Sequence, residues 1–255
     1  MKKFKLVLLA ISLILCSFAG VASADEAQGD ESFGETIQQV DQMRENGATN
    51  EEVIQFLNSK GIEVLASDSV IVDNRGNEVS DISPQALDPS LRVLRNYITK
   101  DSGRYYAWVQ VEKKATLPAN ATYEPYPASY DLVSINWDPK KFDYVANGVT
   151  NRNMWLADAD QRNAGTILFN IYDNFDGENV SVVSGYAKLS AKGTGQTTTA
   201  AKYTHTYYVN KNTSTYSGTA KWSWGNPLDV GVSYSITTIQ NETYWPTAAT
   251  ASVTL

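Results

Sequence analysis

Hydrophobic residues follow three different patterns along the chain, and the first of them is confined to the start. Residues 6–18 form an almost unbroken apolar run after the basic stretch Met1–Lys5, and small residues follow at Ala22–Ala24. A basic start, a short apolar run and an Ala-x-Ala end are typical of a secretory signal peptide, and the run is too short to span a bilayer. We therefore predict that residues 1–24 are a signal peptide and that the protein is secreted and extracellular.

A helical period follows between residues 35 and 61. Two short helices are predicted, and their apolar residues fall on one face of each: Ile37, Val40 and Met43 in the first, Val53, Ile54 and Leu57 in the second. Thr49 and Glu52 have the spacing of a capping box, and Gly47 suits the end of the first helix. Because such a short hairpin of helices is marginal by itself, we expect it to dock on another part of the chain.

Residues 62–79 contain two short apolar runs with a turn at 74–77, which predicts a small β-hairpin. Residues 80–90 (SDISPQALDPS) contain two prolines and show no period. We interpret them as a linker that separates an N-terminal segment, residues 25–90, from a domain that spans residues 91–255.

From residue 91 onward the period becomes two, apart from residues 91–98, which could form a short helix. Tyr203, His205 and Tyr207, for example, alternate with Thr204 and Thr206. Short alternating strands at regular spacing are typical of a mainly β, antiparallel β-sandwich of the jelly-roll or immunoglobulin-like kind. The predicted strands are 105–113, 130–136, 142–146, 166–172, 180–191, 199–210, 216–225, 231–239 and 250–255.

Charge divides the chain at the same place as the linker. Residues 25–90 hold fifteen acidic and three basic residues, whereas residues 91–255 hold thirteen acidic and fifteen basic ones. Two interpretations stay open: a solvated acidic arm, or a prosegment that covers the C-terminal domain and is later removed. Neither part has the clustered basic residues of a nucleic-acid-binding protein.

Residues that usually carry catalysis are scarce. The single cysteine, Cys16, lies in the signal peptide, and His205 is the single histidine, which argues against a zinc site. The sequence has no nucleophile elbow, P-loop or dinucleotide-binding motif. We therefore predict no catalytic residues, no cofactor and a non-enzymatic role. A glycan-active hydrolase stays open as an alternative because it needs only two carboxylates.

Acidic residues on both sides of one predicted strand raise the question of a structural calcium ion. Asp158 and Asp160 precede the strand at 166–172, and Asp173 and Asp176 follow it. Carboxylate oxygens are suitable calcium ligands, but the spacing does not match an EF-hand loop, and Asp commonly shapes turns. Calcium binding by these four residues is left open.

Aromatic residues give the most direct indication of function. The chain has six Trp and fifteen Tyr residues, and exposed aromatic rings are amphipathic surfaces on which sugar rings can stack. We select Trp222 and Trp224, two apart on one predicted strand, and Tyr244 and Trp245, in a predicted loop, as candidate ligand-binding residues.

The leading hypothesis from the sequence is a binding or structural role at the cell surface or in the extracellular matrix. The expected partner is an extracellular glycan or cell-wall polymer, or a second copy of the chain. A secreted toxin or bacteriocin-like protein with an acidic prosegment is the alternative, since Thr/Ser-rich alternating strands such as residues 197–221 occur in membrane-inserting hairpins.

Overall fold

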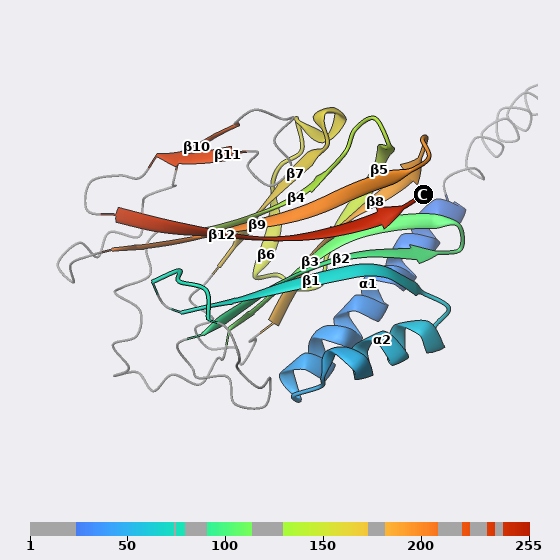
Figure 1. The fold of residues 1–255 in the computed structure, drawn as a ribbon, viewed down its shortest axis with the longest axis horizontal. Helices are drawn as coiled ribbons and strands as arrows, with labels where there is room; N and C mark the ends of the chain where they lie inside the picture. Colours follow the sequence, from blue (N-terminus) through green and yellow to red (C-terminus); the bar gives the residue numbers. More distant parts are fainter. Residues whose placement is uncertain are drawn as a thin grey trace, which may run out of the picture.

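Two five-stranded antiparallel sheets lie face to face in the computed structural model (Figure 1). The structure describes residues 24–73, 75–79, 91–113, 130–172, 182–208, 221–224, 234–237 and 242–255. The first sheet has the order β1 (Glu63–Val72), β2 (Arg92–Asp101), β3 (Arg104–Lys113), β8 (Val182–Ala191) and β5 (Phe142–Val149). The second has the order β12 (Glu242–Thr254), β9 (Gln196–Tyr208), β4 (Asp131–Trp137), β7 (Thr166–Ile171) and β6 (Met154–Asp158). This arrangement confirms the predicted antiparallel β-sandwich.

Alternating residues of both sheets form one apolar core between them. Leu94 and Val109 of the first sheet and Ile135 and Phe169 of the second are almost completely buried in it. Because successive side chains of a strand point to opposite faces, the other residues of the same strands are left for the two outer faces. Those outer faces carry the features that distinguish this sandwich.

The free edges of the sheets are protected from further strand pairing. β1 and β12, the end strands of the two sheets, lie side by side (Figure 1), and the Asp68 carboxylate of β1 accepts a hydrogen bond from the Thr250 backbone N–H at 2.9 Å. Pro246 occupies the same edge of β12, where a missing N–H costs no pairing. At the opposite ends of the two sheets lie β5 and β6. β6 is only five residues long, and both strands contain a register shift. These devices oppose aggregation through the edges.

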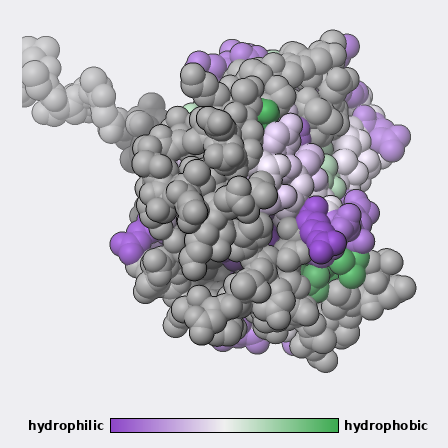
Figure 2. All heavy atoms as spheres, turned by 90° about the vertical axis from the view of Figure 1, so that its left-hand side faces the viewer, coloured by the Kyte–Doolittle hydropathy of each residue, from purple (hydrophilic) through white to green (hydrophobic). Residues whose placement is uncertain are grey.

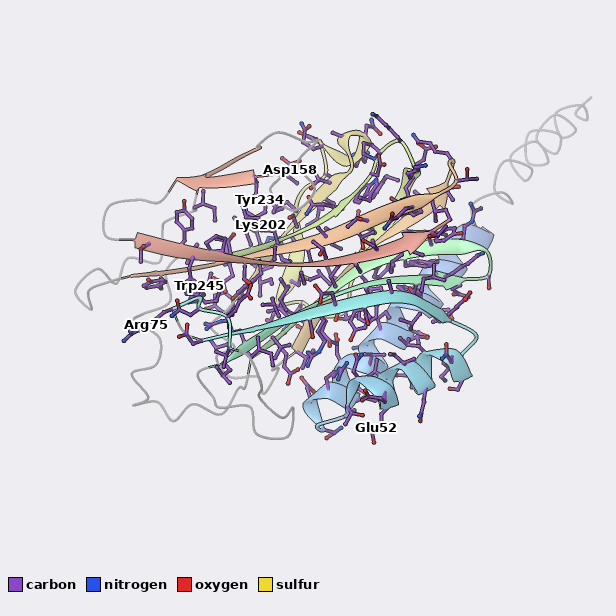
Figure 3. All side chains as sticks on the ribbon, viewed as in Figure 1. Glu52, Arg75, Asp158, Lys202, Tyr234 and Trp245 are labelled. Carbon is purple, nitrogen blue, oxygen red and sulfur yellow. The ribbon has the colours of Figure 1, made fainter. Side chains whose placement is uncertain are left out.

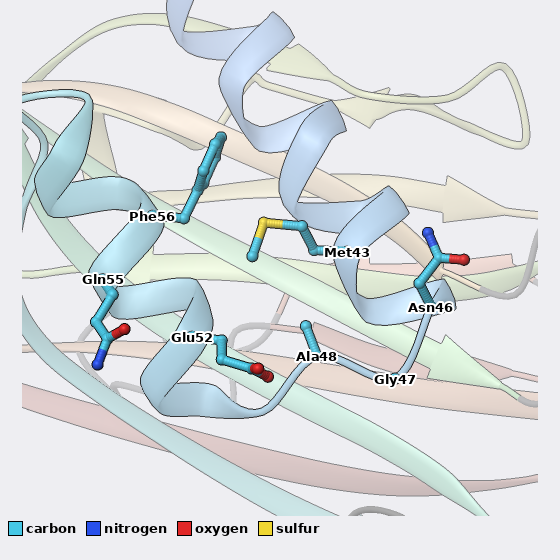
Figure 4. A pocket seen from close by; sticks show the side chains of 7 residues that line it. All are labelled: Met43, Asn46, Gly47, Ala48, Glu52, Gln55 and Phe56. Carbon is cyan, nitrogen blue, oxygen red and sulfur yellow. The ribbon is translucent and has the colours of Figure 1, made fainter.

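Two helices, α1 (Ala24–Glu45) and α2 (Asn50–Ser59), pack on the outer face of the first sheet (Figure 1). The predicted capping box is confirmed: the Glu52 N–H donates to Thr49 Oγ1, and the Thr49 N–H donates to Glu52 Oε2 at 2.7 Å. Gly47 turns the chain between the helices with φ +85°. A groove of about 630 Å³ remains between them (Figure 4), with Met43 and Phe56 on opposite sides.

Aromatic rings form most of the contact between the helices and the sheet. Phe33 of α1 stacks on Tyr106 of β3 with ring centroids 3.7 Å apart, and Tyr97 of β2 stacks on Trp108 of β3 at 3.9 Å. Phe33 also meets Tyr186 of β8 edge-on. The helical hairpin therefore docks on the sandwich, as its shortness led us to expect.

One buried carboxyl group, that of Asp41 in α1, joins the helices to three parts of the first sheet. It accepts hydrogen bonds from Gln110 Nε2 at 2.7 Å, Ser184 Oγ at 2.6 Å and Thr150 Oγ1 at 2.5 Å. Burial nevertheless outweighs these bonds and raises the pKa of Asp41 from 3.8 to about 6. The contact between α1 and the sheet is therefore sensitive to pH.

We expect Asp41 to make the protein less stable as the pH rises from 4 to 6. The folded state binds the proton more tightly than the unfolded state, so the contribution is full below pH 3.8 and lost above about pH 6. The shift corresponds to about 3 kcal/mol. Urea unfolding of the wild type and Asp41→Asn at pH 4.5 and 7.5 measures it: the variant should gain stability relative to the wild type at the higher pH. An equal difference at both pH values would contradict the assignment.

Four local expectations from the sequence are corrected by the structure. Residues 92–98 belong to strand β2 and not to a helix, and β6 at residues 154–158 was not expected. The hairpin predicted at 62–79 is confirmed at its turn, where the Asp73 N–H donates to the Asn77 carbonyl, but its second arm is reduced to a bridge between Val72 and Glu78. The long strand β1 pairs with β2 instead. Residues 244–246 lie within strand β12 and not in a loop.

The division at residue 90 stays a prediction. Strand β1, from the N-terminal side of that division, pairs with β2 on the C-terminal side along its whole length, from Glu63–Lys100 to Val72–Arg92. The N-terminal segment thus contributes one strand and the helical cover to the same sandwich.

Candidate functional site

One end of the second sheet combines a buried polar network with exposed aromatic rings. β4 and β12 begin at this end and β7 and β9 finish there, on the left of Figure 1. Neighbouring residues of these strands point alternately to the core and to the outer face, so the site has an inner and an outer layer.

Asp131, the first residue of β4, is the centre of the inner layer. Its carboxylate is completely buried and accepts hydrogen bonds from the Tyr203 hydroxyl, from the Thr206 backbone N–H at 2.9 Å and from His205 Nδ1 at 2.9 Å. All three donors come from β9. The carboxylate therefore fixes the start of β4 to the end of β9 by side-chain bonds in addition to the backbone ladder.

The other nitrogen of His205 connects this network to the first sheet. His205 Nε2 lies 3.4 Å from the guanidinium of Arg92 in β2, and because a guanidinium can only donate, Nε2 is the acceptor and the ring proton is assigned to Nδ1. The Arg92 guanidinium also lies 5.6 Å from the Trp245 ring of β12. A chain of contacts thus crosses the core from Arg92 through His205 to Asp131.

A turn of the N-terminal segment closes over the same network. The Asp73 carboxylate accepts the backbone N–H groups of Arg75 and Asn77, and Gly76 between them has φ +81°. A Cβ atom at Gly76 would lie 2.7 Å from the Trp245 ring, so this close approach requires glycine. Figure 3 shows Arg75 and Trp245 at the same end of the sandwich.

Burial determines what the inner layer can do. His205 is 1% exposed and Asp131 is 0% exposed. Neither side chain can therefore reach a substrate on the surface. The pair has the composition of a catalytic dyad, but its position suits the holding of three strands in register. We therefore assign Asp131, His205 and Arg92 as positioning residues.

The outer layer contains three aromatic rings in contact. Tyr130 precedes β4, Trp155 lies in β6, and Tyr172 follows β7. The Tyr130 ring lies 4.6 Å from Trp155 in an edge-on arrangement and 6.0 Å from Tyr172. Tyr130 is 40% exposed, and the other two are partly buried, so the three form a surface patch supported by its own ring contacts.

Tyr244 adds a fourth ring on the same face. It is 41% exposed and lies opposite Thr206, whose hydroxyl approaches the Tyr130 backbone carbonyl at 3.5 Å. The order across the sheet is therefore Trp155, Tyr172, Tyr130, Thr206 and Tyr244. We call Trp155, Tyr172, Tyr130 and Tyr244 the aromatic row.

The two layers are linked by sequence neighbours. Tyr130 precedes the buried Asp131, and Tyr244 precedes the buried Trp245. The backbone that carries each exposed ring is therefore held in place by the core contacts of the next residue. Rings held this way lose little freedom when a ligand stacks on them. Figure 2 faces this end: between residues drawn in grey, the described surface is mostly pale or purple, with green in small groups.

The predicted ligand-binding residues are found in three different situations. Tyr244 is exposed in the aromatic row, whereas the Trp245 ring is 7% exposed and packs in the core against Tyr203 and His205. Trp222 and Trp224 lie in β10 (Lys221–Trp224), opposite Ile236 and Tyr234 of β11 (Tyr234–Thr237). The side chains of β10 lie outside the described part, so their role stays a prediction.

The row also contains residues that the sequence analysis did not select. Trp155 lies in a strand that was not expected, and Tyr130 and Tyr172 stand at the ends of predicted strands. Only the register Asp131–Ile171 and Trp155–Asn170 brings the three together.

The β10–β11 ladder covers a neighbouring part of the same outer face. The Lys202 ammonium donates to the Tyr234 backbone carbonyl at 2.8 Å and lies 4.6 Å from the Tyr234 ring (Figure 3). Burial lowers the pKa of Lys202 and raises that of Tyr234. Tyr234 and Ile236 complete a small apolar cluster with Leu132 and Leu168.

Two of the four acidic residues considered for calcium, Asp158 and Asp160, lie in the described structure. The Asp158 carboxylate accepts the Asp160 backbone N–H at 2.6 Å, which is turn chemistry. Asp173 and Asp176 lie outside the described residues. Within the described ranges, no group of three His, Asp or Glu side chains is placed to hold a metal ion.

No family model matches the sequence, and no curated protein matches it. Solved structures resemble parts of the fold only at low score. A cohesin module from a Clostridium perfringens family 33 glycoside hydrolase is 10% identical, with 40% of this chain and 72% of that chain covered and a TM-score of 0.28.

Two other structures bear different descriptions. A structure titled for the pH-induced modulation of Streptococcus parasanguinis adhesion by Fap1 fimbriae is 10% identical. The match covers 76% of this chain and 94% of that chain, with a TM-score of 0.33. A chain titled only "Pore forming protein" is 6% identical. The match covers 74% of this chain and 95% of that chain, with a TM-score of 0.30. Likenesses at these scores carry no functional argument.

Neither helix of the described structure has an apolar stretch long enough to cross a membrane.

Proposed function

We propose that this protein is exported and binds glycans at the cell surface or in the extracellular matrix, without catalysis, through the aromatic row. The observation that carries the proposal is the contact of Tyr130 with Trp155 and Tyr172 on the outer face, at 4.6 and 6.0 Å. The exposed Tyr130 ring, supported by two partly buried rings, offers a flat amphipathic surface on which a sugar ring can stack.

The chemistry of the patch supports a sugar over a purely apolar partner. Asn170 lies opposite Trp155 in the β6–β7 ladder, and both residues are partly buried. Its amide offers two donors and an acceptor beside an aromatic ring. A sugar presents both an apolar C–H face and hydroxyl groups, and this pair of side chains can contact both.

Retention on insoluble polysaccharides tests the proposal. The purified protein, incubated with cellulose, chitin and bacterial cell-wall preparations, should be retained on at least one of them. Trp155→Ala and Tyr130→Ala should each weaken that retention by about twofold to tenfold, the effect of losing one aromatic contact of 0.5–1.5 kcal/mol.

Leu156→Ala provides the matched control. Leu156 is the next residue of β6, is 43% exposed and is not aromatic, so its loss removes apolar surface from the same strand without removing a ring. Retention should be unchanged. No retention of the wild type on any of these materials, or equal losses in Leu156→Ala and Trp155→Ala, would refute the proposal.

A further inference from the structure

The aromatic row contains two stacking positions that one strand separates. The first is the Tyr130 ring together with Trp155 and Tyr172, each of which lies against Tyr130. The second is Tyr244 of β12. β9 lies between β4 and β12 in the sheet, and since neighbouring strands lie about 4.8 Å apart, Tyr244 stands about 10 Å from the Tyr130 strand.

Both positions face the same side of the sheet. Tyr130 precedes Asp131, whose carboxylate points inward to His205, and Tyr244 precedes Trp245, whose ring belongs to the core. Side chains alternate along a strand, so Tyr130 and Tyr244 both point outward. A ligand can therefore touch both positions only if it lies across the strands.

The described part of the row runs from one edge of the sheet to the other. Trp155 is in β6 and Tyr244 in β12, which are the two end strands of the sheet order. Among the described residues, the row therefore reaches from one end strand of this sheet to the other, which suits a segment within a long chain better than a single sugar.

The strength of single ring contacts points the same way. One ring contact changes affinity by only about twofold to tenfold, which leaves a monosaccharide on one position weakly bound. A chain that reaches both positions gains the second contact at a high effective concentration.

We propose, on the basis of the glycan-binding function above, that the ligand is a polysaccharide bound along its length, with the chain perpendicular to the strands and in contact with both the Tyr130 patch and Tyr244. Tyr244 then acts as a length-reading position. It contributes to the binding of long chains and not to that of short ones.

The experiment compares chain lengths and variants. Isothermal titration of the intact protein with cello- and chito-oligosaccharides of two to six sugars, whichever series binds, should give an affinity that rises with length. Tyr244→Ala should lower the affinity for the hexamer by about twofold to tenfold and leave that for the dimer unchanged, whereas Trp155→Ala should lower both. Tyr244→Phe should bind like the wild type, because the ring is kept.

The outcomes separate this inference from the function on which it rests. An affinity that depends on Trp155 but neither rises with length nor responds to Tyr244→Ala would overturn the length-reading role alone. Binding that is unaffected by Trp155→Ala, or absent for every oligosaccharide, would overturn the glycan site and this inference together. Equal thermal stabilities of the three variants would exclude misfolding as the cause.

Discussion

Removal of residues 25–90 is expected to leave a protein that does not fold into a soluble sandwich. The deletion uncovers the aromatic face made by Tyr97, Tyr106, Trp108 and Tyr186, and it makes β2 an unprotected sheet edge. Five almost completely buried side chains are lost with the helices: Phe33, Ile37, Val40, Val53 and Leu57. At about 1.5–3 kcal/mol each, their burial is comparable to the whole stability of a typical domain.

Soluble yield, size-exclusion elution and dye binding of residues 91–255 measure this outcome. A matched control keeps the segment but introduces a protease site between residues 80 and 90, where no described residue is changed. After cleavage the two pieces should remain together through the β1–β2 ladder and the Asp41 contacts. A stable, monomeric fragment 91–255 would instead support the prosegment interpretation and the toxin alternative.

The substitution Asp131→Asn is expected to cost about 3–5 kcal/mol, the range found when one partner of a buried charged network is removed. The amide would turn an N–H₂ group toward donors from Tyr203, His205 and Thr206. It would also remove the negative charge at the end of the chain of contacts that begins at the buried Arg92. For a domain of this size the melting temperature should fall by roughly 6–20 °C.

Tyr203→Phe is the milder comparison, because it removes one donor to the Asp131 carboxylate and keeps the ring, at a cost of about 1.5–3 kcal/mol. Thermal unfolding followed by circular dichroism measures both variants. If Asp131→Asn proved no more destabilising than Tyr203→Phe, Asp131 would not be the centre of the inner layer.

Asp131→Asn should also weaken glycan binding. Its neighbour Tyr130 is placed by the same backbone, and the Thr206 N–H that Asp131 accepts belongs to the strand between the two stacking positions. A variant that stays folded at low temperature but loses affinity would identify Asp131 as a positioning residue for the row.

Local patterns predicted much of the fold. Alternation in β9 was visible because its inner residues Tyr203, His205 and Tyr207 are aromatic and the outer ones are Thr. The capping box of Thr49 and Glu52 depends on residues three apart, so it could be recognised without tertiary structure.

Strand β2 shows where such patterns fail. Residues 92–99 are all buried, because the core lies on one side and α1 and α2 lie on the other. A strand with two buried faces has no polar alternation, and its apolar residues can match a helical period by chance. The helices that cover the outer face of β2 belong to the N-terminal segment. No local sequence pattern specifies where that segment docks, so the burial of this face could not be predicted.

The site was harder to predict than the fold for the same reason. The aromatic row takes one ring from each of four separate segments, and only strand register brings them together. Tyr244 and Trp245 looked equivalent as neighbours in a predicted loop. Pro246 suggested that loop, but an edge strand tolerates proline, and within β12 one ring points outward and the other into the core.

The central claim is that sugars stack on the row, and the proton NMR spectrum of an oligosaccharide tests it most directly. Ring C–H protons of a cello- or chito-hexaose should move upfield when the wild-type protein is added, because stacked rings shield them. The shifts should shrink with Trp155→Ala and persist with Leu156→Ala. Unchanged sugar resonances, or equal shifts with both variants, would contradict the account.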